Sequence, residues 1–198
     1  MEVDGHWGFV NGSTFIAEGL PLGTYFLPEY AGLDEFGDAQ WWDYTPKYDE
    51  ETGEELKGQG EWNKVGDYPN NITGDNKSKK LWGTSQPKVF GGFGTSLYAY
   101  GFDFSIAFDY QLGGVIYDGS YAGYMSSPVA ESLGNNYHRD LLNAWTPDNK
   151  NTDIPRFAYN DTYSASTSTR FLIDASYLNI QNLTLGYTLP AKLTQKFL

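Results

Sequence analysis

Large apolar residues occupy every second position in the second half of the stretch FGGFGTSLYAYGFDFSIAFDYQLGG, residues 90–114. These positions are Phe102, Phe104, Ile106, Phe108, Tyr110 and Leu112. Four of the five residues between them are polar. A strict period of two over this length predicts a β-strand with one apolar and one polar face. The pattern leaves open whether the apolar face meets a protein core or a lipid bilayer.

The residues before this strand predict its hairpin partner. Residues 89–99 place Phe93 and Leu97 on one side of a second strand, and the connection between the two strands falls at Tyr100 and Gly101. We therefore expect a tight antiparallel hairpin in which Phe93 and Leu97 share the apolar face of the first pattern.

A third alternating segment, ASYLNIQNLTLGYTLP, covers residues 175–190. Its apolar positions change from even numbers, ending at Ile180, to odd numbers, beginning at Leu183. One extra residue near Gln181 and Asn182, a β-bulge, would restore a single apolar face.

The remaining pattern predicts short strands and long connections. Residues 24–33 and 38–45 predict two strands joined by the turn DEFG, and Pro28 makes the first an edge strand or an irregular one. Residues 46–86 and 118–170 are polar and show no sustained period, so they predict long exposed connections, the first with room for a small hairpin.

Three features favour lipid on the apolar face. Tight turns that alternate with very long connections are typical of outer-membrane barrels. An eleven-residue strand reaches about 36 Å and, tilted by about 45°, crosses an apolar band about 25 Å tall. Tyrosines also gather near the hairpin ends, as in an interfacial aromatic girdle: Tyr98, Tyr100, Tyr110 and Tyr117. A soluble β-sandwich also alternates, so periodicity alone keeps both readings open.

Composition narrows the class of protein. Aromatic residues make up 17% of the chain, which also has 23 Gly and 9 Pro, and this favours strands joined by turns. The formal net charge of −12 argues against nucleic acid and anionic membrane surfaces as partners. The absence of cysteine excludes disulfides, cysteine-ligated zinc and thiol nucleophiles. No run approaches the roughly 18 apolar residues of a membrane helix.

Four blocks in this order resemble the C-terminal barrel region of SusC/RagA-type TonB-dependent receptors. They are AEGLPLGTYFLPEYAGLD (17–34), QPKVFGGFGTSLYAYGFDFSIAFDYQLGGVIYD (86–118), WTPDNKNTDIPR (145–156) and STRFLIDASYLNIQNLTLGYTLPAKL (168–193). Together they cover nearly half of the chain. The resemblance implies a plugged barrel of the 22-stranded type in the outer membrane of a Gram-negative bacterium.

The same resemblance implies function and partners. The parent receptor would import an oligosaccharide or a peptide with a SusD-like surface lipoprotein as lid, driven by the TonB complex. We expect residues 1–198 to be a partial C-terminal portion of the barrel, without signal peptide, plug domain or final strands. The expected fold is all-β, with antiparallel strands of a transmembrane β-barrel that form an open curved sheet when isolated. The six alternating apolar residues would face outer-membrane lipid.

Four aromatic residues are candidates for contact with substrate or lid: Trp41, Trp42, Tyr44 and Trp145. Their flat faces suit the apolar surfaces of sugar rings. Packing or anchoring at the membrane interface is the simpler explanation for each of them, and we favour it over contact with a sugar.

Other motifs indicate no chemistry. His6 and His138 are the two histidines, and HRD at residues 138–140 lacks the asparagine that would follow it in a kinase. NKNTD at 149–153 has no closing glutamate, and residues 47–62 lack the DxNxDG order of a calcium loop. We therefore expect no catalytic residue, no metal site and no cofactor, and a protein that is not an enzyme.

Two alternative functions belong to other classes of protein. A soluble, aromatic-rich, carbohydrate-binding β-sandwich would share the alternation and the exposed tryptophans. A β-sandwich hydrolase is disfavoured because no carboxylate pair lies at a strand end. A chain that folds cooperatively as a monomer in plain buffer would support the first alternative over the membrane reading.

Overall fold

The computed structural model describes residues 1–66, 76–129, 134–191 and 195. Its strands are β1 (Glu2–Val3), β2 (His6–Asn11), β3 (Thr14–Ala17), β4 (Thr24–Pro28), β5 (Tyr30–Leu33), β6 (Ala39–Thr45), β7 (Glu61–Val65), β8 (Lys79–Thr84), β9 (Val89–Ala99), β10 (Phe102–Leu112), β11 (Val115–Tyr117), β12 (Leu172–Asp174) and β13 (Tyr177–Tyr187). The helical elements are α1 (Gly119–Tyr124), η3 (Arg139–Asn143) and η4 (Thr169–Phe171). The strand registers are antiparallel, which confirms the predicted all-β class.

The chain divides into two compact units. Unit 1 comprises Met1–Thr84 and Ile116–Ile173, and unit 2 comprises Ser85–Val115 and Asp174–Leu198. Each unit is described by itself below.

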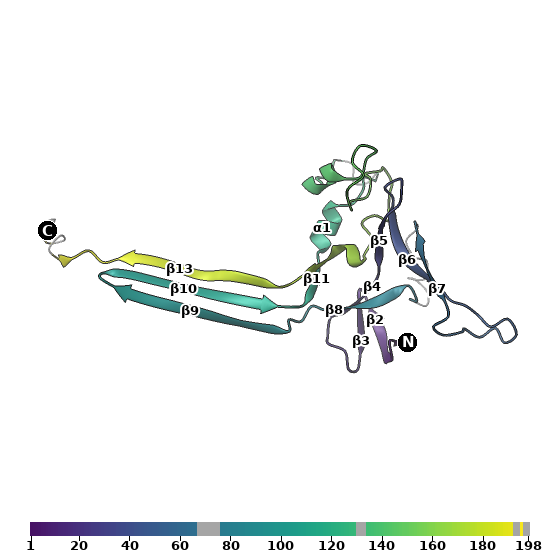
Figure 1. Cartoon of the computed structure of the whole chain (residues 1–198), viewed down its shortest axis with the longest axis horizontal. Helices are drawn as coiled ribbons and strands as arrows, with labels where there is room; N and C mark the ends of the chain where they lie inside the picture. The colour runs from purple at the N-terminus through teal and green to yellow at the C-terminus, as the bar shows by residue number, and fades with distance from the viewer. Residues whose placement is uncertain (67–75, 130–133, 192–194, 196–198) are drawn as a thin grey trace. The chain divides into compact units, whose positions relative to one another are not determined.

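Unit 2 is built on one sheet of three long strands in the order β13-β10-β9, which lie side by side in Figure 1. Each strand has eleven residues. β9 and β10 pair along their whole length, from Phe102 opposite Ala99 to Leu112 opposite Val89. The connection is the predicted tight turn, in which Tyr100 and Gly101 both have positive φ (52° and 88°). A two-residue turn of this kind matches the twist of the strands that it joins.

The predicted β-bulge is confirmed in β13. Ala107 of β10 lies opposite Asn182, whereas the next residue, Phe108, lies opposite Ile180. Gln181 is therefore the extra residue between two paired positions. Because of this insertion, the apolar residues on both sides of it point to the same face of the sheet.

Unit 1 contains several smaller sheets. The largest has five strands in the order β1-β2-β3-β4-β8, another has the order β5-β6-β7, and β11 pairs with β12. Phe15 of β3 and Phe26 of β4 are buried in this sheet, at 0% and 1% exposure, with their ring centroids 5.5 Å apart.

The short strands near the DEFG turn follow the prediction with one irregularity. Residues 24–33 form two strands, β4 and β5, separated at Glu29 next to Pro28. β4 pairs with β8, whereas β5 pairs with β6 across the predicted turn. The strand is thus irregular at Pro28, as the missing backbone donor of proline favours.

The prediction of one long connection over residues 46–86 was wrong in part. Residues 61–65 form β7 on β6, and residues 79–84 form β8 on β4. The expected small hairpin is present, with an antiparallel bridge between Tyr48 and Glu55. Residues 67–75 of this segment lie outside the described residues.

The described residues of the connection 118–170 are mostly irregular, as predicted, but they have their own core, and residues 130–133 lie outside the described residues. Ala122 and Met125 of the α1 region pack on Phe171, which is 1% exposed. Tyr121 and Leu141 pack against this cluster from its margin. Within the described residues, no helix is long and apolar enough to cross a membrane.

Candidate functional site

Cross-strand pairing gathers large apolar side chains on one side of the unit 2 sheet. In an antiparallel sheet, directly opposite residues point to the same face. The registers therefore place seventeen residues on this apolar face: Val89, Gly91, Phe93, Thr95, Leu97, Ala99, Phe102, Phe104, Ile106, Phe108, Tyr110, Leu112, Leu178, Ile180, Leu183, Leu185 and Tyr187. The prediction that the six β10 residues share a face with Phe93 and Leu97 is confirmed.

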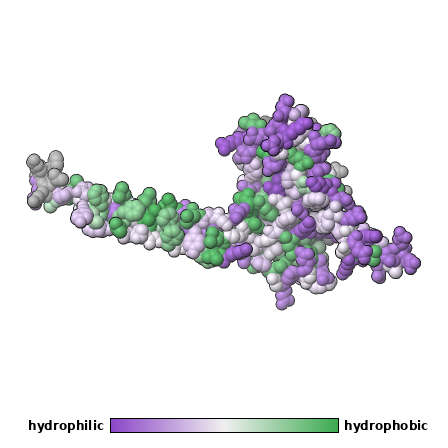
Figure 2. All heavy atoms as spheres, in the orientation of Figure 1, coloured by the Kyte–Doolittle hydropathy of each residue, from purple (hydrophilic) through white to green (hydrophobic). Residues whose placement is uncertain are grey.

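No described residue of unit 2 buries the apolar face. Leu97 of β9 and Leu185 of β13 are 65% and 74% exposed. Figure 2 shows hydrophobic residues, in green, along this sheet, whereas hydrophilic residues prevail on the visible surface of unit 1. Full burial of one large apolar side chain is worth about 1.5–3 kcal/mol. The face therefore needs an apolar environment from outside unit 2.

The opposite face of the same sheet is mostly polar or small. It carries Asp103, Ser105 and Asp109 of β10, with glycines and Asn, Ser and Thr residues on the neighbouring strands and the rings of Phe90, Tyr98 and Tyr177 towards its ends. The Asn179 amide donates a hydrogen bond of 3.1 Å to the Asp109 carboxylate. At Gly94 a Cβ atom would come within 2.8 Å of the Ile106 carbonyl oxygen, so a larger residue would disturb the strand pairing.

Aromatic side chains lie at the turn end of the sheet. The rings of Phe102 and Tyr187 have centroids 4.4 Å apart. Tyr100, in the turn itself, is 98% exposed, and Tyr98 is also exposed. Amphipathic rings in this position suit the boundary between an apolar layer and water.

Two of the four candidate aromatic residues lie on successive positions of β6. Trp41 is 1% exposed and packs edge-on against Tyr30, with ring centroids 6.3 Å apart. Trp42 points to the other face of the strand, where the Lys64 ammonium lies 5.3 Å from its ring centroid. The structure therefore gives Trp41 a packing role, and it leaves Trp42 half-buried under a lysine.

The other two candidates have packing contacts in different places. The ring of Tyr44 lies 5.2 Å from that of Trp62, and its hydroxyl accepts a hydrogen bond of 3.1 Å from the Gly60 amide. Trp145 packs on Gly37, where a Cβ atom would come within 2.4 Å of the indole ring. The four aromatics thus do not form one stacking surface, and a role in substrate or lid contact stays a prediction.

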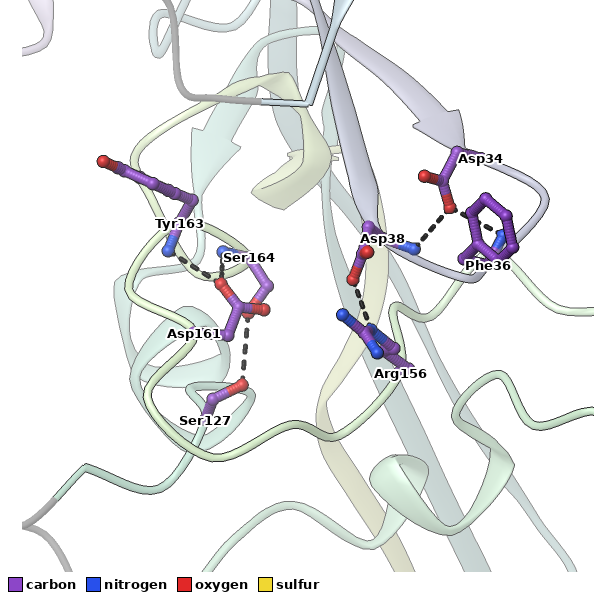
Figure 3. Close-up of polar contacts among 8 residues, drawn as sticks. All are labelled: Asp34, Phe36, Asp38, Ser127, Arg156, Asp161, Tyr163 and Ser164. Atoms are coloured by element: carbon purple, nitrogen blue, oxygen red, sulfur yellow. Dashed lines mark hydrogen bonds and ion pairs between the residues drawn. The ribbon is translucent and has the colours of Figure 1, made fainter.

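A pocket of about 400 Å³ lies in unit 1 beside the β5–β6 turn (Figure 3). Its lining includes the side of Trp41, together with residues of the turn and of the segment 156–163. Asp34 organises the turn, because its carboxylate accepts hydrogen bonds from the amides of Phe36 (2.9 Å) and Asp38 (2.8 Å). Asp and Asn often stabilise turns in this way.

Arg156 joins the second segment to this turn. Its side chain pairs with the Asp38 carboxylate, and its amide donates a hydrogen bond of 2.9 Å to the Gly37 carbonyl (Figure 3). The hydrogen bond that Arg156 donates to the Asp38 carboxylate, together with the negative charge of Asp38, raises the pKa of Arg156. Further along, the Asp161 carboxylate accepts from the amides of Tyr163 (2.9 Å) and Ser164 (3.0 Å). Both walls of the pocket are therefore held by charged side chains.

Buried polar groups support the region next to this pocket. The hydroxyls of Ser127 and Ser164 lie 3.5 Å apart, and Arg170 donates a hydrogen bond to the Ser164 carbonyl. Burial raises the pKa of Tyr30 to about 12, while the nearby Arg170 opposes this rise. The Tyr30 hydroxyl donates to the Asp153 carbonyl at 3.1 Å. These contacts tie residues 153–170 to β5.

The HRD tripeptide has a structural explanation. His138 precedes η3, and its ring nitrogen accepts a hydrogen bond of 3.3 Å from the Asp140 amide. The Tyr121 hydroxyl donates to the Asp140 carboxylate at 3.0 Å, and its ring lies edge-on to His138. Across the described residues, no group of three or more His, Cys, Asp or Glu is placed to hold a metal ion.

Sequence reasoning did not find the pocket of Figure 3. The order DEFGD does indicate a turn that begins at an aspartate, so the role of Asp34 in this turn is predictable from sequence. The pairing of Asp38 with Arg156 spans 118 residues, and nothing in the local sequence of either segment predicts it.

One known protein is similar to most of the chain. TonB-dependent receptor P3 of Formosa agariphila is 30% identical over 175 residues, which are 88% of this chain. The chain spans 16% of the length of that relative. No protein-family model matches.

Proposed function

We propose, from the premise that this chain is related to the TonB-dependent receptors, that it builds barrel wall and extracellular loops of an outer-membrane importer in a Gram-negative bacterium. In this proposal unit 2 supplies three neighbouring strands of a transmembrane β-barrel, within the C-terminal portion of the receptor. Unit 1 supplies structured loops between them.

The apolar face of unit 2 is the observation that carries the proposal. Three paired strands of eleven residues present large apolar side chains on one face, whereas the other face is mostly small or polar, with Phe90, Tyr98 and Tyr177 towards its two ends. Strands of this length cross a bilayer when tilted by about 45°. Phe102, Ile106 and the other apolar residues of β10 would then contact lipid, and Asp103 and Asp109 would face the barrel interior.

The chain connections fit the asymmetry of an outer-membrane barrel. The two-residue turn joins β9 to β10 at one end of the sheet. At the other end, where Gln111 of β10 lies opposite Tyr177 of β13, the chain enters and leaves the long segments of unit 1. Short turns on the periplasmic side and long loops outside are the rule in such barrels. Unit 1 would accordingly be extracellular.

The edges of the unit 2 sheet also require neighbours. β9 and β13 are its outer strands, so each has a row of backbone groups with no partner strand among the described residues. Unpaired backbone groups are costly in lipid, and closed barrels avoid them. Further strands of the parent receptor would pair with both edges.

The substrate and partners of the parent follow from the resemblance. We propose import of an oligosaccharide or a peptide, with a SusD-like surface lipoprotein as lid and energy from the TonB complex. The contribution of this chain would be geometric, as wall and loop, with no catalytic step. Trp42 and Tyr44 are the aromatic candidates on β6 that remain partly accessible for contacts with lid or substrate.

The test uses the full-length receptor in its own outer membrane. Replacement of residues 49–58, an exposed hairpin, by two glycines should leave barrel assembly intact, because shortening a surface loop has a small entropic effect. Lid association or uptake should fall if unit 1 is extracellular. Assembly is measured by heat-modifiable electrophoretic mobility, lid association by co-purification, and uptake with and without a functional TonB complex.

Two results would contradict the proposal. One is failure of assembly after the loop replacement combined with tolerance of a charged residue in the middle of β10, which would exchange the roles of loop and wall. The other is recovery of the full-length protein from a detergent-free soluble fraction as a folded monomer, which would favour the carbohydrate-binding β-sandwich.

A further inference from the structure

A second pocket of unit 1, of about 460 Å³, lies between α1 and residues 135–137. Its lining residues are Gly119, Ser120, Gly123, Tyr124, Ser126, Asn135, Asn136 and Tyr137. None of these side chains carries a charge at neutral pH. In a chain with a net charge of −12, an uncharged pocket of this size is a distinct local environment.

The walls of this pocket are anchored on the core of unit 1. α1 directs Ala122 and the neighbouring Met125 into the cluster around Phe171, so its other side is left for the pocket. The His138 amide donates a hydrogen bond of 2.9 Å to the Tyr124 carbonyl and fixes the following segment beside the helix. The lining is therefore tied to packed residues on both sides.

Several polar groups of the lining are available to a ligand. The side chains of Ser120, Asn135 and Asn136 have no hydrogen-bond partner among the described residues. Hydroxyl and amide groups of this kind can each donate and accept. Tyr124, which is 54% exposed, adds an accessible aromatic face. The pocket thus combines neutral donors and acceptors with a flat apolar surface.

The pocket of Figure 3 differs in charge. Asp34, Asp38, Asp161 and Arg156 line it, and each carboxylate or guanidinium is already used in a turn or an ion pair. A charged ligand group that entered the uncharged pocket would lose hydration and would find no counter-charge among the lining residues. A neutral ligand with many hydroxyls loses less, because each lost water contact can be replaced by an amide or hydroxyl.

We propose that the pocket lined by Ser120, Tyr124, Asn135 and Asn136 binds a neutral saccharide unit. One face of a pyranose ring carries C–H groups that suit the Tyr124 ring, and its hydroxyls suit the serine and the two asparagines. The proposal rests on the importer function proposed above. It specifies the imported substrate as a neutral glycan rather than a charged glycan or a charged peptide.

The experiment uses the full-length receptor purified in detergent. Calorimetric titration is done with cellohexaose, xylohexaose and mannohexaose, and with hexagalacturonate and a lysine-containing hexapeptide as charged comparisons. At least one neutral hexasaccharide should bind. Tyr124→Ala should weaken that binding about tenfold, the size expected for loss of an aromatic contact and its buried area. The double variant Asn135→Ala/Asn136→Ala should weaken it to a similar degree.

Tyr159→Ala is the matched control. Tyr159 is an exposed tyrosine of the same unit (64%), but it belongs to the pocket of Figure 3. This variant should leave the affinity for the neutral hexasaccharide unchanged. An equal loss in Tyr124→Ala and Tyr159→Ala would overturn the assignment of the site.

Other outcomes also decide the proposal. Absence of binding to all three neutral hexasaccharides overturns it, as does binding that neither the Tyr124 nor the asparagine variant weakens. Binding of hexagalacturonate or the peptide that Tyr124→Ala abolishes overturns the neutral class. Barrel assembly and membrane location are measured on the same preparations. If the receptor assembles in the outer membrane but substitutions in this pocket do not change saccharide binding, this inference alone is refuted. If the protein binds the saccharide through this pocket but is found outside the membrane, the importer function alone is refuted.

Discussion

The two units use alternating strands in opposite ways. Unit 1 has a buried apolar core, with Phe15, Phe26 and Trp41 at 0–1% exposure, although Trp7 and Phe9 of β2 are 73% and 61% exposed. In unit 2, no residue of β9, β10 or β13 is buried, although these are the longest strands and the richest in large apolar residues. An alternating sequence therefore determines that a strand has an apolar face, but not what covers that face.

The covering material sets the physical requirements on the side chains. A protein core is packed to crystal-like density, so the volume and shape of each residue matter. A lipid bilayer is fluid and fills gaps around a smaller side chain, so apolarity matters more than shape. The same substitution should consequently have different costs in the two units.

The largest effect is expected for a large-to-small change in the core of unit 1. Phe26→Ala should lower the free energy of unfolding by about 3–5 kcal/mol, because a cavity adds to the lost burial. Phe104→Ala on β10 should cost about 1.5–3 kcal/mol, since lipid removes the cavity term. Denaturant midpoints of the full-length receptor, followed by protease protection of each unit, compare the two. Equal costs would indicate that the apolar face meets a packed protein surface.

A charged residue should distinguish the two faces of the unit 2 sheet. Ile106→Arg, at the middle of β10, should cost about 2–4 kcal/mol at the centre of a bilayer. Asp109→Asn on the polar face is the matched control. It should have almost no effect on the amount of assembled barrel, because it keeps the shape of the side chain. The amount of heat-modifiable barrel in the outer membrane measures both. Similar damage from the two changes would argue for a buried core on both sides of the sheet.

The parts that were predictable from sequence are those governed by local pattern. Alternation along β10, the phase change at Gln181 and the pair Tyr100-Gly101 each specify a feature within a few residues, and the structure has all of them. Strand pairing between distant segments lacks such a marker. The sequence pattern predicts a connection where β7 and β8 lie, because polar residues separate these strands from their partners, β6 and β4.

The candidate sites were harder to predict from sequence for the same reason. Trp41 and Trp42 are neighbours in sequence, yet only the strand geometry shows that one is buried and the other lies under Lys64. The pocket of Figure 3 depends on Arg156 reaching Asp38 across 118 residues. The uncharged pocket depends on α1 lying beside residues 135–137. Tertiary contacts of this length have no periodic signature.

The high pKa of Tyr30 offers a test of unit 1 by pH. Burial raises this pKa from 10.0 to about 12, so the folded unit favours the neutral phenol. The corresponding stability is fully present below pH 10 and is lost as pH rises towards about 12. Protease protection of unit 1 should therefore weaken over this interval, and Tyr30→Phe should reduce the pH dependence. An unchanged dependence in the phenylalanine variant would mean that Tyr30 titrates without linkage to folding.

The smallest effects are expected in the two-residue turn of unit 2. Tyr100 has φ of 52°, which is uncommon for a large side chain and favoured by asparagine. In water, Tyr100→Asn should therefore stabilise the hairpin, by at most about 1 kcal/mol. Gly101→Ala should act in the opposite direction, because Gly101 has φ of 88° and a Cβ atom would lie 3.0 Å from the Thr188 carbonyl oxygen.

A bilayer adds a second contribution to the stability of this turn. Tyr100 is 98% exposed, and an interfacial tyrosine would gain from contact with the lipid head groups. The denaturant midpoint of the full-length receptor is measured for both variants in detergent and in lipid vesicles. We expect Gly101→Ala to destabilise equally in both media, whereas the benefit of Tyr100→Asn should be smaller in vesicles than in detergent. A benefit of the same size in vesicles would show that the Tyr100 ring contacts no membrane surface, and the turn would then lie away from the interface.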